Sequence, residues 1–259
     1  MTAHDSRAET GVTRIAQTRE GTQMEVIVEA PTAMSFNGTT AAVMMGTPSD
    51  LRDLAYGFAL TEGYLTSLSE VESFEELRHD KGYEARFWVT PERAQAIAAR
   101  RRAMAGPVGC GLCGLESLQE VMQPLPVVRA PLRLTDGDIA KAMHDLYAWQ
   151  PLKHRTRSTH AAGFYEPGNG IVAAREDVGR HNALDKLIGH LVQTGQSGAQ
   201  GAIVMTSRIS LELVQKTAIF GSPMLIAASG PTSLAIDTAK ASGISLIGFC
   251  RGGDYETFC

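Results

Sequence analysis

Short apolar runs alternate with helix-like segments through the second half of this 259-residue chain, and this alternation constrains its fold more than any other feature. The apolar runs fall at 171–174, 203–205, 224–228 and 245–249, and each is too short for a helix of ordinary length. Between the first two runs, the segment 179–191 gathers four apolar side chains on one helical face: Ala183, Leu184, Leu187 and Leu191. The pattern predicts an α/β domain with a buried, largely parallel sheet.

The first half of the chain predicts an α+β arrangement. Alternating segments at 24–29, 41–45 and 84–89 favour strands, and Asn37-Gly38 is a turn signal. Thr47-Pro48-Ser49-Asp50 predicts a helix start with Thr47 as the N-cap. The buried stripe of that helix is expected to be Leu51, Leu54, Ala55 and Phe58. Two further helices are expected, over 91–104 and from about Thr135.

Proline, glycine and polar stretches mark the predicted domain boundaries. We expect a flexible N-terminus over 1–12, the α+β part over 13–105, and a C-terminal α/β domain over 132–259. The segment 106–131 between them is predicted to be a Gly/Cys loop and linker, because Pro124, Pro126 and Pro131 interrupt it.

Charge and hydropathy restrict the partners. With 24 basic and 28 acidic residues the net charge is −4, which argues against a general nucleic-acid binder. No apolar run reaches the roughly 18–20 residues that span a bilayer. The polar residues 1–11 carry no hydrophobic signal segment. We therefore expect a cytoplasmic protein that binds neither nucleic acid nor membrane.

A pair of cysteines, Cys110 and Cys113, lies inside the glycine-rich stretch from Gly106 to Gly114. Neither a helix nor a strand runs easily through so many glycines, so we expect a loop that presents both thiols and lets them move. The other cysteines, Cys250 and Cys259, are too unevenly placed for a disulfide framework. The pair therefore indicates sulfur chemistry or metal capture.

Four interpretations of the pair stay open from the residues alone. A structural zinc site needs four ligands, and the chain has no second Cys-x-x-Cys, so the site would have to be shared by two subunits. A dithiol oxidoreductase usually carries its pair at a strand-to-helix junction. A sulfur carrier needs a mobile loop whose thiolate takes up sulfur as a persulfide. The last interpretation is a structural pair without chemistry.

Polar residues follow three consecutive predicted strands. They are Thr206, Ser207 and Arg208 after the first, Ser229, Thr232 and Ser233 after the second, and Cys250, Arg251, Gly252 and Gly253 after the third. Ligands of open α/β sheets collect at the carboxyl ends of the strands, where helix N-termini present free N–H groups. Hydroxyls, guanidinium groups and glycines suit a phosphate or pyrophosphate there. Ser210, Thr232 and Ser233 also fit a simpler role as helix caps.

The densest polar cluster is Glu176-Asp177-Val178-Gly179-Arg180-His181-Asn182. Asp177 suits the cap of the following helix, and Lys186 is placed to pair with a nearby acid. Arg180 and His181 fall in the first helical turn, where the helix dipole disfavours positive charge unless an anion offsets it. We therefore predict a bound anion beside these two residues. His160, which precedes an apolar run, is a secondary candidate.

Several motifs follow one another along nearly the whole chain. They are Thr47-Pro48-x-Asp50-Leu51 with Gly57-Phe58 and Glu62-Gly63, Cys110-x-x-Cys113, Thr159-His160-Ala161-Ala162, the run from Glu176 to Lys186, Ser207-Arg208-x-Ser210-x-Glu212-Leu213-x-x-Lys216, Pro231-Thr232-Ser233 and Gly248-Phe249-x-Arg251-Gly252. In this order they resemble the motifs of the formate dehydrogenase accessory sulfurtransferases, the FdhD/NarQ family.

The resemblance implies a sulfurtransferase that accepts sulfur from a cysteine desulfurase. It implies delivery of that sulfur to the molybdenum bis(molybdopterin guanine dinucleotide) cofactor of formate dehydrogenase, whose molybdenum subunit would be a partner. The persulfide-carrying cysteine corresponds to Cys110, with Cys113 as its partner, and the cofactor-binding stretch to Phe249–Asp254. The resemblance further implies a homodimer, and a three-layer α/β/α C-terminal domain similar to the cytidine deaminase fold.

Two further expectations accompany the resemblance. A non-catalytic chaperone that binds the molybdenum cofactor for formate dehydrogenase is the alternative function. No deaminase zinc is expected, because Ala161-Ala162 follows His160 where deaminases place a glutamate, and no Pro-Cys-x-x-Cys comes later. The chain departs from the usual family pattern at Arg157-Ser158, where glycines are common, and at Asp254, where a basic or neutral residue is more usual.

Overall fold

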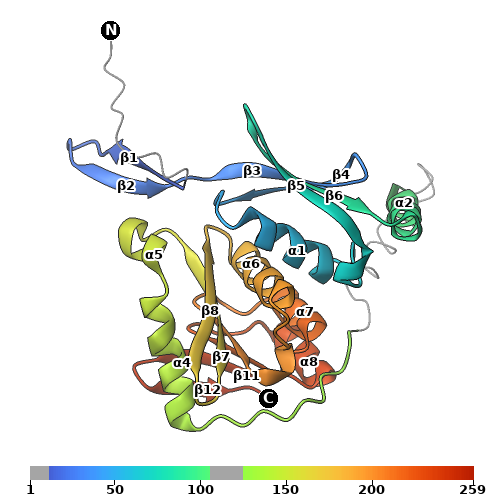
Figure 1. The fold of residues 1–259 in the computed structure, drawn as a ribbon. Coiled ribbons are helices and arrows are strands. Elements are labelled where there is room, and N and C mark those ends of the chain that lie inside the picture. Colours follow the sequence, from blue (N-terminus) through green and yellow to red (C-terminus); the bar gives the residue numbers. More distant parts are fainter. Residues whose placement is uncertain (1–11, 106–124) are drawn as a thin grey trace.

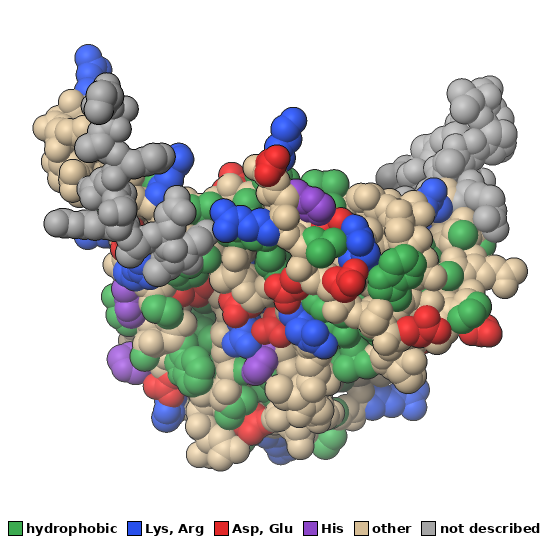
Figure 2. Space-filling model, turned by 45° about the horizontal axis from the view of Figure 1, so that its top comes forward, with side chains coloured by type: hydrophobic (Ala, Val, Ile, Leu, Met, Phe, Trp, Pro, Cys, Tyr) green, Lys and Arg blue, Asp and Glu red, His purple; other side chains and the backbone are tan. Residues whose placement is uncertain are grey.

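A computed structural model describes residues 12–105 and 125–259 of the chain (Figure 1). The predicted sulfur loop with Cys110 and Cys113 therefore lies outside the described residues. Within them, the strands form a two-stranded, a four-stranded and a six-stranded sheet. On the face shown in Figure 2, acidic and basic side chains are interspersed among apolar ones. None of the helices in these two ranges is both long and apolar enough to cross a membrane.

The N-terminal part is α+β, as the sequence predicts. Its elements are β1 (Thr13–Gln17), β2 (Gln23–Ile27), β3 (Ala30–Phe36), β4 (Thr39–Gly46), α1 (Leu51–Thr61), the 3-10 turn η1 (Leu68–Glu70), β5 (Val71–His79), β6 (Gly82–Val89) and α2 (Pro91–Ala105). Strands β1 and β2 pair with each other, and the larger sheet has the order β4-β3-β6-β5. Helix α1 lies under this sheet (Figure 1) and buries the predicted stripe against Met34 and Phe87.

Helix α1 begins later than its sequence predicts. Thr47 is not the N-cap: that position belongs to Asp50, whose backbone is left-handed with φ 50° and whose side chain caps no N–H of the described chain. The Thr47 backbone N–H instead donates to the Asp177 carboxylate at 3.0 Å. Its hydroxyl accepts from the Val178 N–H at 3.3 Å. Thr47 therefore bonds to residues about 130 positions later in the sequence and does not cap the helix that the local pattern predicts.

The C-terminal domain is a three-layer α/β/α sandwich, as predicted. Its elements are α4 (Asp136–Ala148), α5 (Pro151–Thr156), β7 (His160–Glu166), β8 (Gly170–Asp177), α6 (Arg180–Gln193), η2 (Gly198–Gln200), β9 (Ala202–Met205), α7 (Leu211–Phe220), β10 (Met224–Ala227), α8 (Ser233–Ser242), β11 (Ser245–Arg251) and β12 (Asp254–Thr257). The strand order is β12-β11-β10-β9-β7-β8. Helices α6, α7 and α8 pack on one face of the sheet, and α4 packs on the other.

This sheet is mixed, which corrects the expectation of a largely parallel one. Strands β9, β10 and β11 are parallel to one another. Strand β7 runs antiparallel to both β8 and β9, and β12 runs antiparallel to β11. The β7–β8 hairpin turns through Gly168 and Gly170, both with positive φ, and β12 follows the turn at Gly252-Gly253. The parallel strands are therefore confined to the centre of the sheet, where the helical crossovers connect them.

Helix α1 crosses α6 at very short range, and two glycines permit the contact. A Cβ atom at Gly57 would lie 1.8 Å from the Asp185 carbonyl oxygen, and one at Gly189 would lie 1.9 Å from the Asp53 carbonyl oxygen. At one end of the crossing the Thr61 hydroxyl donates to the Asp185 carboxylate at 2.8 Å. The N-terminal part and the C-terminal domain are thus joined backbone to backbone.

Replacement of Gly57 by alanine tests this crossing. We expect Gly57→Ala to lower the free energy of unfolding by about 3 kcal/mol, the upper end of the usual overpacking cost, because the added methyl group meets backbone rather than a movable side chain. Urea denaturation followed by circular dichroism measures the loss. Gly137→Ala is the matched control, since Gly137 is exposed in α4 and an added Cβ atom would meet only the Thr135 hydroxyl oxygen, at 3.7 Å, and alanine is the better helix former. Equal losses in the two variants would contradict the crossing as described.

Candidate functional site

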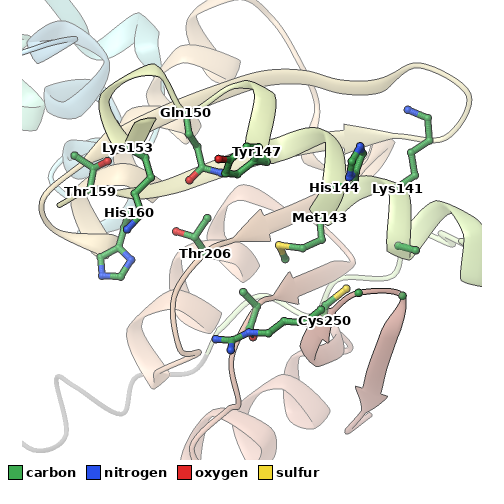
Figure 3. A pocket seen from close by; sticks show the side chains of 15 residues that line it. Lys141, Met143, His144, Tyr147, Gln150, Lys153, Thr159, His160, Thr206 and Cys250 are labelled. Atoms are coloured by element: carbon green, nitrogen blue, oxygen red, sulfur yellow. The ribbon is translucent and has the colours of Figure 1, made fainter. Parts of the chain in front are cut away.

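A cavity of about 920 Å³ opens at the carboxyl ends of the three parallel strands (Figure 3). One wall is formed at the ends of those strands, by Thr206, Ala228 and residues 250–253. The opposite wall belongs to α4 and α5, and the start of β7 closes one end with Thr159 and His160. This volume lies in the range of small-molecule sites. The cavity is at the sheet edge where the sequence predicts an anion.

The predicted cofactor stretch, 249–254, divides between the cavity and other surfaces. Residues 250–253 line the cavity, and the turn passes through Gly252 and Gly253 with φ 62° and 100°. The Arg251 Nε donates to the Ala228 carbonyl at 3.2 Å, which anchors the guanidinium at the wall. Phe249 is 52% exposed, and its ring lies against Gly230 instead. Asp254, also exposed, begins β12 outside the cavity lining.

Cys250 lines the cavity with its side chain almost entirely buried, at 1% exposure. Its Sγ contacts the carbonyl of Ile139 on α4 at 3.8 Å. Burial raises the pKa of the Cys250 thiol, so the thiol stays protonated near neutral pH. A protonated thiol is a poor nucleophile, and Cys250 is therefore part of the wall rather than a second sulfur acceptor.

Most of the predicted hydroxyls bond to backbone. The Thr206 hydroxyl, which does line the cavity, accepts from the Ala161 N–H at 2.9 Å. The Ser207 hydroxyl donates to its neighbour's carbonyl, and Thr232 caps α8 by accepting from the Ala235 N–H at 3.2 Å. Besides Phe249 and Asp254, seven predicted residues do not line this cavity within the described chain: Arg180, His181, Ser207, Arg208, Ser229, Thr232 and Ser233. Their role in ligand binding stays a prediction.

Sequence reasoning missed the wall formed by α4 and α5. Lys141, His144 and Tyr147 project from successive turns of α4, and Lys153 projects from α5 (Figure 3). The i, i+3, i+6 spacing of the first three was the available signal, because it puts them on one face of the helix. Taken alone, that face is indistinguishable from a solvated one, and only the packing of α4 on the sheet brings it to the strand ends.

The polar cluster at 176–182 is largely structural. The Glu176 carboxylate accepts the Leu152 and Lys153 N–H groups at 2.7 and 2.8 Å, so it caps the start of α5. Asp177 and Lys186, both with fully buried side chains, form an ion pair at 2.7 Å. Lys186 thus pairs with a nearby acid, as the sequence suggested. Asp177 also accepts from the Gly179 N–H at 2.8 Å, directly before α6.

The two histidines of the motifs lie in different surroundings. The His181 Nε2 lies 3.4 Å from the Ser210 Oγ and 3.7 Å from the Glu212 carboxylate. His160 instead faces the cavity (Figure 3). Burial and the charges of Lys153 and Arg180 lower the pKa of His160. Its imidazole is therefore neutral near physiological pH.

Metal ligation finds no support in the described residues. Over 12–105 and 125–259, no three His, Cys, Asp or Glu side chains gather closely enough to hold a metal ion. Cys110 and Cys113 lie outside those ranges.

Comparison with known proteins identifies the family. The family model described as "FdhD/NarQ family" matches residues 27–259. The chain belongs to the FdhD/NarQ family. It is 48% identical to the sulfur carrier protein FdhD of Agrobacterium fabrum, over 95% of this chain and 93% of that one. It is 46% identical to the sulfur carrier protein FdhD of Brucella abortus, over 89% and 86% of the two chains.

A solved structure shows the same fold. The crystal structure of a putative formate dehydrogenase accessory protein from Desulfotalea psychrophila superposes with a TM-score of 0.71. The match covers 95% of this chain and 94% of that one at 24% sequence identity. The family model and the two relatives confirm the family resemblance inferred from the motifs, and this structure supports the fold. The likeness to the cytidine deaminase fold stays a prediction.

The state of Cys250 in this FdhD/NarQ family member is testable by alkylation. We expect iodoacetamide at neutral pH to leave Cys250 unmodified in the folded protein, because its thiol is buried and protonated. Peptide mass spectrometry after timed quenching measures the modified fraction. The same reaction in urea, which should alkylate Cys250 fully, is the control. Modification of the folded protein at the rate seen in urea would contradict the buried position.

Proposed function

We propose that this protein carries sulfur for formate dehydrogenase, taking it from a cysteine desulfurase and delivering it to the molybdenum bis(molybdopterin guanine dinucleotide) cofactor. The observation that carries the proposal is the 48% identity, over nearly the full length of both chains, to a protein named sulfur carrier protein FdhD. The formate dehydrogenase link draws support from the accessory protein that shares the fold. A homodimer in the cytoplasm, with the molybdenum subunit of formate dehydrogenase as partner, belongs to the same proposal.

The sulfur steps are thiol exchange reactions. The Cys110 thiolate attacks the terminal sulfur of the desulfurase persulfide, so that the desulfurase S–S bond breaks, Cys110 gains the persulfide, and the desulfurase cysteine leaves as a thiolate. The Cys113 thiolate then attacks Cys110 Sγ and expels hydrosulfide toward the molybdenum. This leaves a disulfide between Cys110 and Cys113, which a thiol reductant must reduce before the next cycle.

The cavity supports a nucleotide-bearing acceptor. A guanine dinucleotide carries a pyrophosphate, and phosphates bind to guanidinium groups and to exposed backbone N–H groups. Arg251 and the Gly252-Gly253 turn lie on one wall. Lys153 adds positive charge on the other wall, where the Lys141 ammonium is paired with the Asp145 carboxylate. Tyr147, 64% exposed at the rim, offers an aromatic surface. These groups would hold the acceptor by its nucleotide, away from the reacting molybdenum.

Sulfur loading at Cys110 is the first test. After incubation with a cysteine desulfurase and cysteine, we expect the wild-type protein to gain about one sulfur atom per chain, because the Cys110 thiolate is the proposed acceptor. Intact-protein mass spectrometry measures the gain. Cys110→Ala should abolish it. Cys259→Ser is the matched control and should load normally, since burial raises the pKa of the Cys259 thiol.

Failure of this test would select the alternative function. If an active desulfurase loads no sulfur on the wild type, or if Cys110→Ala restores formate dehydrogenase as well as the wild type does, sulfur carriage is overturned. A chaperone that binds the molybdenum cofactor would then be the better description, and nucleotide binding would be its remaining activity.

Nucleotide binding is tested separately with GDP. We expect Arg251→Gln to weaken GDP binding by about tenfold or more, because hydrogen bonds to charged groups contribute about 1.5–3 kcal/mol. Isothermal titration calorimetry measures the dissociation constant. Lys240→Gln removes an exposed cation of α8 outside the cavity lining and should leave it nearly unchanged. Equal affinity of the wild type and Arg251→Gln would remove Arg251 from the site.

A further inference from the structure

Three basic residues from three elements lie at or beside one end of the cavity: Lys153 and His160 line it, and Arg180 follows three residues after Asp177, the register partner of His160. Lys153 of α5 and His160 of β7 line that end, opposite Lys141 and His144 (Figure 3). Arg180 is the first residue of α6. Its charge, like that of Lys153, acts on the His160 imidazole and lowers its pKa. The three groups are therefore electrostatic neighbours.

None of the three has a carboxylate partner within the described residues. The Lys153 ammonium donates to the Arg157 carbonyl at 3.1 Å. That carbonyl belongs to the C-cap residue of α5, which is left-handed with φ 58°. In residues 12–105 and 125–259, the Arg180 Nε is the buried side-chain polar atom left without a hydrogen-bond partner. The described part of the chain also supplies no hydrogen bond to the His160 ring.

The nearby carboxylates are already engaged. Glu176 accepts from two backbone N–H groups of α5 and from the Thr159 hydroxyl at 2.8 Å. Asp177, the register partner of His160 on β8, is paired with buried Lys186. The Glu212 carboxylate lies 3.7 Å from the His181 Nε2 and also interacts with the Arg180 charge, without an ion pair to it. Within the described chain, these three carboxylates therefore form no ion pair with Lys153, His160 or Arg180.

Such an arrangement is unfavourable unless an anion completes it. A buried donor without an acceptor costs about 1–3 kcal/mol, and a cation in the first turn of α6 opposes the helix dipole. One tetrahedral dianion would offset both. We propose that Lys153, His160 and Arg180 form an anion subsite that binds a phosphate-like group, separate from the Arg251 and Gly252-Gly253 wall. That this group belongs to a guanine dinucleotide rests on the proposed function; the subsite itself does not.

His160 gives the subsite a pH dependence. In the empty site its imidazole is neutral, because burial and two neighbouring cations oppose protonation. A bound dianion reverses that balance, so His160 takes up a proton and its pKa rises. Affinity for the dianion is therefore greatest below the His160 pKa of the free protein. It falls as the pH rises toward the higher pKa of the complex.

Proton NMR of the histidine rings tests the subsite, with inorganic sulfate as the probe. Sulfate keeps its charge throughout the range in which imidazole titrates, and sodium chloride at matched ionic strength corrects for screening. The His160 resonance is assigned by its absence in His160→Gln. We expect sulfate to raise the His160 pKa by about one unit, which corresponds to roughly tenfold tighter binding to the protonated form.

Variants of the neighbouring cations show which residues contribute to the sulfate-induced rise of the His160 pKa. Arg180→Gln and Lys153→Gln should each reduce the sulfate-induced shift, while Lys240→Gln should leave it intact. An unchanged His160 pKa in wild-type protein with and without sulfate would overturn the subsite, whatever the variants do. The measurement on wild-type protein with and without sulfate uses no variant, so its outcome does not depend on whether Arg180→Gln folds.

A GDP arm separates this proposal from the proposed function. If GDP shifts the His160 resonance at lower concentration than sulfate does, the subsite holds a nucleotide phosphate. If sulfate shifts it and GDP does not bind, the subsite stands as a site for a free oxyanion, and the nucleotide part of the proposed function fails. If GDP binds by calorimetry but neither ligand moves His160, the subsite fails and the nucleotide site stands.

Discussion

The backbone contact between α1 and α6 is the constraint on which the rest of the structure depends. Gly57 and Gly189 bring the two helices together without intervening side chains. The segment from Thr47 to Asp50, which leads into α1, therefore lies beside α6 and the residues before it. There the Lys186 ammonium donates to the Thr47 carbonyl at 2.9 Å and pairs with Asp177. Removal of one partner from a buried ion pair costs about 3–5 kcal/mol. The pair therefore fixes the start of α6, and with it Arg180 at the end of the cavity.

A second buried lysine holds the other end of the same helix pair. The Lys216 ammonium of α7 lies 3.0 Å from the Asp185 carboxylate and 2.7 Å from that of Glu62. Burial alone would lower the pKa of Lys216, but the two carboxylates outweigh it and raise that pKa. Many residues of the family-like motifs thus maintain the join between the two parts. The length of a motif is consequently weak evidence for a chemical role. Arg180 is informative because its Nε has no hydrogen-bond partner in the described chain.

Periodicity predicted the elements whose partners are local. The run at 203–205 and the helix over 179–191 follow from apolar spacing, and the stripe from Leu51 to Phe58 is buried as expected. Strand β7 was missed because Ala161-Ala162-Gly163 carries little β-propensity, and it exists through its pairing with both β8 and β9. Thr47 was misassigned for the same reason, since its partner Asp177 is distant in sequence. The cavity edge was predictable from the strand ends, whereas its α4 wall required the packing of that helix on the sheet.

Arg157 illustrates how this protein holds a cation without a counter-charge. Its left-handed backbone, an uncommon conformation for a residue with a side chain, turns its carbonyl toward the Lys153 ammonium. A neutral carbonyl dipole orients the lysine but leaves its net charge intact, so the field at the cavity mouth extends into solvent. Ligand capture should then be assisted by long-range attraction. That assistance weakens as salt shortens the screening length, which is about 8 Å at physiological ionic strength.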